Sequence, residues 1–165
     1  MIKKYFDLIT VLGLVVCLGN ICRSPTAHGV FEQLLRDAGL SNSIKVDSCG
    51  TGDWHLDHAP DRRAQLTAKQ HGFNLSHLRS RLICHDDFRD FDYILAMDKN
   101  NLRDILALCP DRYKNKCQLF LNFAKELDIQ EVPDPYYGGD DGFEDVLNMI
   151  KVASQHLLQE ISVDI

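Results

Sequence analysis

Apolar residues along the chain form short continuous runs that predict buried strands. The clearest run covers residues 10–16, where β-branched and apolar side chains occupy both faces, as in a central strand of a parallel sheet. Further strands are predicted over residues 44–48, 93–97 and, with a weaker pattern, 118–121. Because helical patterns separate these runs, we expect a mainly parallel sheet joined by crossover helices.

Between the strands, apolar residues recur at helical spacing. The first helix is expected to begin with Ser24 as its N-cap and Pro25 in its first turn, and to stop at Gly39. Further helices are predicted over residues 61–71, 100–108 and 142–161. Gly72 is expected to end the first of these three.

The alternation of strand and helix, repeated four times, predicts an α/β fold. We expect a single domain over residues 1–165, with a doubly wound four-stranded parallel sheet and helices on both faces. A chain of 165 residues with 45% hydrophobic and 25% charged content suits one such domain. Ligands bind such sheets beyond the carboxyl ends of the strands, so the site is expected in the loop of residues 17–24.

Charge and cysteine usage narrow the classes of function. With 18 Lys and Arg against 24 Asp and Glu, the net charge is −6, and no basic run could follow a nucleic-acid backbone, so nucleic acid is not expected as a partner. The apolar run over residues 8–16 is too short to span a membrane, and its flanks do not suit a signal peptide. The 6 cysteines lack zinc-ligand spacing. Scattered thiols instead favour a reducing, cytoplasmic location.

The loop after the first strand contains a cysteine, five further residues, an arginine and a hydroxyl residue. This pattern is weak alone, but it lies where a buried strand becomes a helix N-terminus, whose N–H groups and dipole attract anions. Arg23 adds a fork of donors suited to phosphate oxygens. We therefore expect phosphate to be bound by Leu18, Gly19, Asn20, Ile21, Cys22, Arg23 and Ser24.

Cys17 begins this loop and lies in the same positive field, which favours the nucleophilic thiolate form. Ser24 is placed to donate a hydrogen bond to that thiolate and to stabilise it as a leaving group, besides capping the helix. Gly19 and Asn20 suit the left-handed backbone that such a loop needs. The loop therefore indicates nucleophilic chemistry on a bound phosphate.

Residues 16–25, with the sequence VCLGNICRSP, resemble the signature of the low-molecular-weight protein tyrosine phosphatases. The likeness begins at about Leu12 and covers nearly the whole remaining chain. It includes Trp54 and residues 46–48, 60–61, 71–72, 91–95, 97–98, 101–104 and 134–138. Together these motifs are highly specific for the family.

The resemblance implies a protein tyrosine phosphatase that acts on phosphotyrosyl proteins and aryl phosphates without a cofactor or metal. It implies Cys17 as the nucleophile that forms a cysteinyl-phosphate, Arg23 as the phosphate clamp and Asp134 as the general acid and then base. These roles suit the chemistry, since the phosphate needs fixed donors and an in-line attacker needs an acid on the opposite side. The pocket wall is implied to be aromatic, formed by Trp54, Tyr136 and Tyr137.

The resemblance also implies residues that support the loop. A hydrogen-bond network is implied among Asn20, Ser24, Ser48 and His77. Cys22 is implied to form a reversible disulfide with Cys17 that protects the nucleophile from further oxidation. His28 departs from the family, which often has an acidic residue at this position.

Two other functions remain open at this point. A thiol-dependent arsenate reductase shares this fold and first loop but needs a further cysteine pair, and Cys84 has no cysteine near it in sequence until Cys109. A phosphoprotein-binding module would use the loop without chemistry, and would need neither thiolate nor acid. The pocket would equally suit a phosphotyrosyl protein, a bacterial kinase tail or a small acyl or aryl phosphate. From the size of the chain we expect a monomer or weak dimer.

Overall fold

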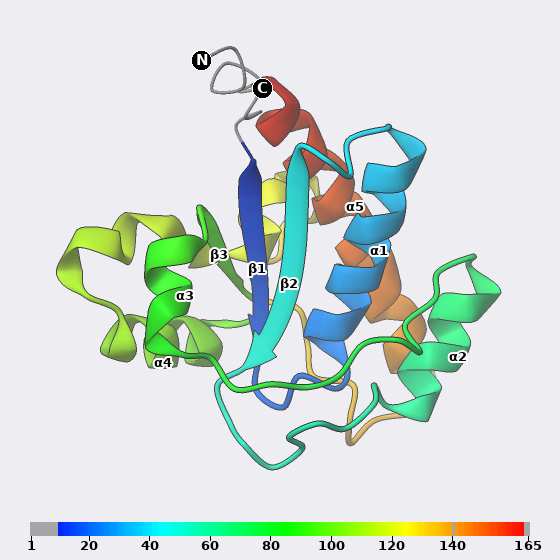
Figure 1. Ribbon diagram of the computed structural model, residues 1–165. Coiled ribbons are helices and arrows are strands. Elements are labelled where there is room, and N and C mark those ends of the chain that lie inside the picture. The colour runs from blue at the N-terminus through cyan, green and yellow to red at the C-terminus, as the bar shows by residue number, and fades with distance from the viewer. Residues whose placement is uncertain (1–9, 140, 164–165) are drawn as a thin grey trace.

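A four-stranded parallel sheet forms the centre of the computed structural model, which describes residues 10–139 and 141–163 (Figure 1). Its strands are β1 (Val11–Cys17), β2 (Ile44–Gly50), β3 (Tyr93–Ala96) and β4 (Cys117–Leu119). They lie in the order β2-β1-β3-β4 with parallel pairing throughout. The order reverses at β1, so the loop that leaves β1 opens at the switch point where ligands bind such sheets.

Helices cover both faces of this sheet (Figure 1). One face carries α1 (Arg23–Asp37) and α5 (Asp141–Val163), and the other carries α3 (His85–Asp90) and α4 (Lys99–Leu108). The helix α2 (Arg62–Gln70) packs beside α1 and α5. Among the described residues there are also three short 3-10 turns: η2 (Asp111–Lys116), η3 (Phe120–Phe123) and η4 (Lys125–Leu127). The expected single-domain, doubly wound α/β fold is confirmed.

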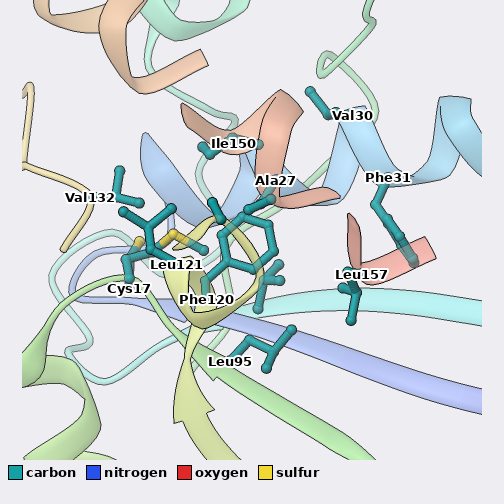
Figure 2. Close-up of a cluster of buried hydrophobic side chains, with 14 of the residues drawn as sticks. Cys17, Ala27, Val30, Phe31, Leu95, Phe120, Leu121, Val132, Ile150 and Leu157 are labelled. Atoms are coloured by element: carbon teal, nitrogen blue, oxygen red, sulfur yellow. The ribbon is translucent and has the colours of Figure 1, made fainter. Parts of the chain in front are cut away.

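The strand β1 is buried on both faces, which anchors the loop that follows it. On one face, Val15 and Cys17 pack with side chains of α1 and α5 in the cluster that Figure 2 shows. On the other face, Leu14 and Val16 pack with side chains of α3 and α4. Each fully buried aliphatic side chain contributes roughly 1.5–3 kcal/mol. Since a one-residue slip would exchange the two faces, the position of Cys17 at the end of β1 is strongly specified.

The C-terminal ends of α1 and α2 agree with the prediction from the sequence, whereas the N-cap of α1 does not. Gly39 and Gly72, with φ of 70° and 87°, take the left-handed conformation just beyond these helices, as predicted. The N-cap of α1 is Cys22, with no side-chain capping bond. The prediction that Ser24 caps this helix is therefore wrong, because its hydroxyl is directed to the sulfur of Cys17 instead.

Two other elements differ from the sequence pattern. The edge strand β4 starts one residue earlier than predicted and ends at Leu119, because the chain then enters the turn η3. The helix α3 was not predicted, since six residues are too few to show an apolar period. It is stabilised by a capping arrangement between Cys84 and Asp87.

The predictions about the N-terminus and about metals concern the whole chain. Residues 1–9, which belong to the predicted 1–165 domain and to the segment compared with a signal peptide, lie outside the described residues. Within residues 10–139 and 141–163, no helix has the length and apolar character needed to cross a membrane. Over those two ranges, no three His, Cys, Asp or Glu side chains gather as metal ligands would.

Candidate active site

The loop after β1 folds around the sulfur of Cys17. The backbone N–H of Asn20 donates to Cys17 Sγ over 3.2 Å, and Ser24 Oγ lies 3.0 Å from the same sulfur. Asn20 reaches this position with a left-handed φ of 55°, as predicted, which asparagine tolerates better than most residues. Cys17 is buried, and the donors around its sulfur suit a thiolate.

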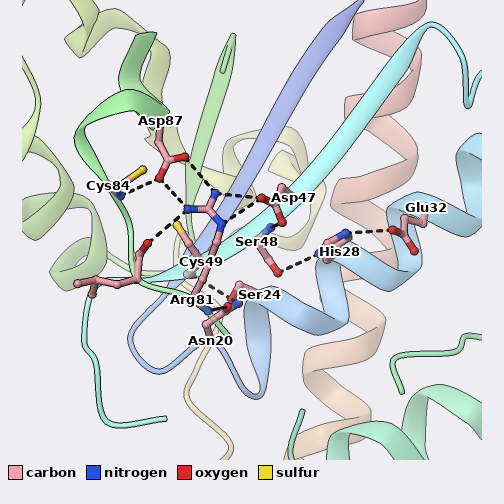
Figure 3. A network of polar contacts seen from close by, with 11 residues as sticks. Asn20, Ser24, His28, Glu32, Asp47, Ser48, Cys49, Arg81, Cys84 and Asp87 are labelled. Atoms are coloured by element: carbon pink, nitrogen blue, oxygen red, sulfur yellow. Dashed lines mark hydrogen bonds and ion pairs between the residues drawn. The ribbon is translucent and has the colours of Figure 1, made fainter. Parts of the chain in front are cut away.

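Asn20 and Ser24 hold each other, and Asn20 also binds a distant segment. Asn20 Nδ2 donates to Ser24 Oγ over 2.7 Å, and Asn20 Oδ1 accepts from the backbone N–H of Arg81 over 3.0 Å. Ser24 Oγ additionally lies 3.4 Å from the carbonyl oxygen of Cys49 on β2 (Figure 3). The loop is thus fastened to the end of β2 and to the chain around Arg81.

Arg23 is buried and held by two other segments. Its NH1 group donates to Asp98 Oδ2 over 2.6 Å and to the carbonyl oxygen of Val132 over 3.0 Å. Burial alone would lower the pKa of the guanidinium, but the charges of Cys17, Asp98 and Asp134 outweigh burial and raise this pKa above its ordinary value. Arg23 is therefore a fixed cation beside the sulfur.

Asp134 lies above this floor on the segment that leads to α5. Its Oδ2 lies 3.6 Å from the NH2 group of Arg23, and its Oδ1 accepts from the backbone N–H of Tyr136 over 3.0 Å. Arg63 on α2 donates to the carbonyl oxygen of Tyr136 over 3.1 Å, which fastens this segment to α2. The carboxylate is 40% exposed, so it meets both the pocket and solvent.

A pocket of about 360 Å³ joins these residues. Its lining includes all three aromatic residues predicted to wall it, and Trp54 and Tyr137 are 67% and 92% exposed. The rings of Tyr136 and Tyr137 meet edge to face with centroids 4.9 Å apart. The full lining is Cys17, Leu18, Gly19, Ile21, Cys22, Arg23, Trp54, His55, Asp134, Tyr136 and Tyr137.

His55 lines the pocket, although the sequence did not single it out. Its ring lies 6.2 Å from the ring of Tyr136, between centroids. A Cβ added to Gly19 would lie only 3.1 Å from Cδ2 of His55. Gly19 lacks the left-handed φ that was predicted for it, and its small size instead leaves room for this ring. The one available signal was that His55 follows Trp54.

The four residues of the predicted loop-supporting network make two sets of contacts. Asn20 and Ser24 bond directly, but Ser48 Oγ lies 2.9 Å from Nδ1 of His28, and His77 contacts Glu32 over 3.0 Å. The other oxygen of Glu32 lies 3.0 Å from Nε2 of His28. Ser48 and His77 are thus linked through the buried His28 ring and Glu32.

Glu32 is the charged centre of this second network. The hydrogen bond from His28, followed by the charge of that ring and by the contacts with His77, lowers the pKa of the Glu32 carboxyl from 4.5 to about 2. Glu32 lies one turn further along α1 than His28 and supplies the negative charge of this network.

Arg81 organises the base of the loop and was missed from the sequence. Its guanidinium binds Asp87 over 2.9 and 3.0 Å and Asp47 over 3.1 and 3.0 Å (Figure 3). Its backbone carbonyl accepts from Gly50 over 2.8 Å, beside the N–H that it donates to Asn20. Asp87 lies 6 residues from Arg81, but Asp47 and Asn20 lie 34 and 61 residues away, so no local pattern indicates the whole cluster.

Cys22 lies in the same pocket as Cys17 and is also buried. Burial, followed by the charges of Asp61 and Cys17, raises the pKa of the Cys22 thiol above its usual range. Cys22 is therefore held as a neutral thiol next to the candidate nucleophile. The predicted disulfide between them stays a prediction.

Comparison with protein families matches residues 13–165 to the family described as low molecular weight phosphotyrosine protein phosphatase. A protein of that name from Schizosaccharomyces pombe is 44% identical over 150 residues, which cover 90% of this chain and 96% of the relative. The low molecular weight protein-tyrosine-phosphatase YfkJ of Bacillus subtilis is 37% identical over 148 residues, covering 90% of this chain and 94% of that protein.

Solved structures agree with this match. The protein tyrosine phosphatase of Entamoeba histolytica, with Hepes in its active site, superposes with a TM-score of 0.91 at 36% identity, covering 94% of this chain and 99% of that one. The structure of YfkJ superposes with a TM-score of 0.89 at 35% identity, covering 94% of this chain and 96% of that one. The likeness therefore extends over the whole fold.

Proposed function

The chain belongs to the low molecular weight phosphotyrosine protein phosphatase family and is a hydrolase, and from this we propose that it cleaves phosphotyrosine through a cysteinyl-phosphate on Cys17. Small aryl phosphates are substrates of the same site. The observation that carries the proposal is the sulfur of Cys17, held between Asn20 and Ser24 on a pocket floor that also presents Arg23.

The floor of the pocket binds the phosphate group. The loop of residues 18–22 leads into the start of α1 at Arg23, where the helix dipole favours an anion. Arg23 contributes a permanent positive charge and directional donors to the phosphate oxygens. This local field overcomes the net charge of −6 on the chain as a whole.

In the first step, the Cys17 thiolate attacks phosphorus. The S–P bond forms, the bond from phosphorus to the phenolic oxygen breaks, and Asp134 gives its proton to the departing oxygen. The exposure of Asp134 above the floor suits this role, because the leaving group departs on the side away from the sulfur. The product of the step is tyrosine and a cysteinyl-phosphate.

In the second step, water releases the phosphate. Asp134, now a carboxylate, takes a proton from the water as it attacks phosphorus, and the S–P bond breaks. The sulfur leaves as a thiolate, and Ser24 Oγ at 3.0 Å is placed to stabilise it. Inorganic phosphate then dissociates and the site is regenerated.

The aromatic wall sets the preference for phosphotyrosine. Trp54, Tyr136 and Tyr137 line the pocket above the sulfur and can stack on a phenyl ring. A phosphoserine side chain is shorter and has no ring to stack. We therefore expect aryl phosphates to be hydrolysed much better than alkyl phosphates.

The first experiment measures hydrolysis of p-nitrophenyl phosphate by the reduced protein in EDTA at mildly acidic pH. We expect turnover by the wild type and by Cys84→Ser, an exposed thiol outside the pocket, but none by Cys17→Ser. Phosphate binding should survive in Cys17→Ser. Absence of wild-type turnover would contradict the proposal and would favour an arsenate reductase or a phosphoprotein-binding module instead.

The second experiment tests the role of Asp134 with a series of aryl phosphates. We expect Asp134→Ala to reduce kcat by about 10²–10⁴-fold for poor leaving groups and much less for good ones, because a stable phenolate needs no proton. Asp145→Asn, an exposed substitution on α5, serves as the matched control. Equal losses across the series would exclude Asp134 as the general acid.

We also propose that the enzyme works in the cytoplasm as a monomer or weak dimer, with Cys22 as a redox partner of Cys17. A thiolate nucleophile with a neighbouring thiol requires a reducing compartment to stay active. Sedimentation at several concentrations tests the oligomeric state. Peroxide inactivation that a thiol reductant reverses in the wild type, and not in Cys22→Ser, tests the redox partner.

A further inference from the structure

A second pair of cysteines meets outside the pocket. Cys117 Sγ lies 3.9 Å from Cys109 Sγ, and Cys109 Sγ in turn lies 3.4 Å from the carbonyl oxygen of Pro110. The two residues are eight positions apart in sequence, and η2 connects them. Neither lines the pocket that holds Cys17 and Cys22, so the catalytic chemistry leaves this pair without a role.

Both thiols are held by regular backbone structure. Cys109 is the C-terminal capping residue of α4, and its N–H donates to the carbonyl oxygen of Ile105. Cys117 is the first residue of β4 and pairs with Ile94 on β3. The side chains meet in the apolar cluster on the α4 face of the sheet, so their proximity does not depend on an exposed loop.

We propose that Cys109 and Cys117 form a reversible disulfide when the reduced protein meets a hydroperoxide, and that this is a modification site separate from the catalytic thiols. Cys117 is the more exposed of the two and reacts first. Its sulfur attacks the peroxide, which leaves a sulfenic acid on Cys117 and one molecule of water. The Cys109 sulfur then displaces the sulfenic oxygen as a second water. Two thiols and one hydrogen peroxide thus give one disulfide and two waters.

The geometry favours the product, and the surroundings slow its formation. The sulfurs are already near contact, and they have to approach from 3.9 Å to a bond length of about 2.05 Å. Burial, with the neighbouring Cys109, raises the pKa of Cys117 to about 12, although Lys116 opposes this shift. Few Cys117 side chains are thiolates at neutral pH, so the reaction needs more peroxide or more time than an activated thiol does.

The disulfide joins the edge of the sheet to the helix that covers it. β4 has three residues and pairs with β3 on its inner side. A bond from Cys117 to Cys109 fastens this short strand to the end of α4 and restricts the unfolded chain. We expect the melting temperature of the oxidised protein to rise by about 5 °C, with the pocket left open.

Peptide mapping tests the proposal on the full chain. The reduced protein is treated with hydrogen peroxide, remaining thiols are alkylated, and the sample is digested with trypsin without reduction. Cleavage after Arg103, Arg112, Lys116 and Lys125 places Cys109 and Cys117 in separate peptides, whereas Cys17 and Cys22 share residues 5–23. A linked pair of peptides 104–112 and 117–125 that disappears on reduction is the expected result. Alkylated Cys109 and Cys117 after the Cys17 peptide has been oxidised would overturn the proposal.

Matched variants separate this site from the others. Cys117→Ser, or Cys117→Val if the serine variant folds poorly, should lose both the linked peptides and the rise in melting temperature while keeping phosphatase turnover. Cys84→Ser should keep both. Linkage of Cys117 to any cysteine other than Cys109 would refute the pairing. A linked pair with an unchanged melting temperature would refute the clamping effect.

Discussion

The floor and the rim of the pocket are built in opposite ways. The pocket floor (Cys17 and Arg23, with Asn20 and Ser24 supporting them from behind the lining) is 3% exposed or less, and each of these side chains has a fixed hydrogen-bond partner. In the pocket rim (Trp54, His55, Tyr136 and Tyr137), Trp54 and Tyr137 are 67% and 92% exposed. The ring of Tyr136 meets Tyr137 edge to face and His55 at a tilt. The floor therefore has one geometry available to it, while the rim has several.

This difference separates chemistry from substrate choice. Charge stabilisation in the transition state depends on donors that are already in position, which the buried floor supplies. Recognition of a phenyl ring depends on contact area, which exposed aromatic side chains supply at lower geometric precision. Substitutions on the floor should then reduce kcat, and substitutions on the rim should mainly raise KM.

The largest effect is expected for Arg23→Lys, which keeps the charge but removes the planar fork. A lysine cannot bind Asp98, Val132 and a phosphate at once, so we expect kcat for p-nitrophenyl phosphate to fall about 10³-fold. Steady-state kinetics measure the loss. Arg62→Lys, on an exposed position of α2, should behave as the wild type. A loss below tenfold would show that charge alone suffices at the floor.

A smaller effect is expected for Ser24→Ala. This change removes the hydroxyl next to the Cys17 sulfur and the partner of Asn20 Nδ2, and a hydrogen bond to a charged group contributes about 1.5–3 kcal/mol. We expect kcat to fall by roughly 10–100-fold with little change in KM. Ser162→Ala, at an exposed position near the end of α5, is the control. A rise in KM without a change in kcat would argue against leaving-group stabilisation.

Substitutions on the rim should have smaller effects than those on the floor, and they should change KM rather than kcat. Trp54→Ala should raise KM for an aryl phosphate by about 3–10-fold and leave kcat within about twofold, since stacking contributes roughly 0.5–1.5 kcal/mol. Leu66→Ala is a matched control, because Leu66 is 60% exposed but lies outside the pocket. A fall in kcat as large as that expected for Ser24→Ala would place Trp54 with the floor.

The smallest effect on activity is expected for Glu32→Gln, because Glu32 lies outside the pocket. This substitution tests instead how much the charge of Glu32 contributes to the stability of the fold. The pKa of Glu32 is lower in the folded chain, about 2 instead of 4.5, so its carboxylate stabilises the fold above pH 4.5 and loses this effect as the pH falls toward 2. Because the side chain is partly exposed, we expect the free energy of unfolding to drop by only about 1 kcal/mol at pH 6.

Urea unfolding at pH 6 and pH 3 measures this effect. The difference between the wild type and Glu32→Gln should shrink at the lower pH, while the exposed control Glu160→Gln should show no difference at either pH. A constant difference at both values would show that Glu32 acts by packing rather than by its charge.

Elements with a strong local signal were predictable. The strand predicted over residues 10–16 differs from β1 (Val11–Cys17) by one residue at each end. A continuous apolar, β-branched run is typical of a strand that is covered on both faces. Gly39 and Gly72 marked helix ends because glycine, which has no Cβ, adopts the left-handed conformation with the least strain. The short α3 had no comparable signal and was missed.

Contacts between distant segments were not predictable in the same way. The link from Ser48 to His77 runs through His28 and Glu32, and nothing in the sequence near Ser48 or His77 indicates these intermediates. The approach of Cys109 to Cys117 likewise depends on where α4 ends relative to β4. Such details follow from the packing of elements rather than from their patterns.

The order of residues was enough to indicate the strands, the helices other than α3, the loop of residues 17–24 and the chemical types that gather there. Those features depend on local periodicity and on residue chemistry, which the chain carries at each position. The tertiary structure decided which groups complete the site: Asp98 and Val132 at Arg23, and Arg81 at Asn20. These partners lie between 61 and 109 residues away, so only the folded sheet brings them within hydrogen-bond distance.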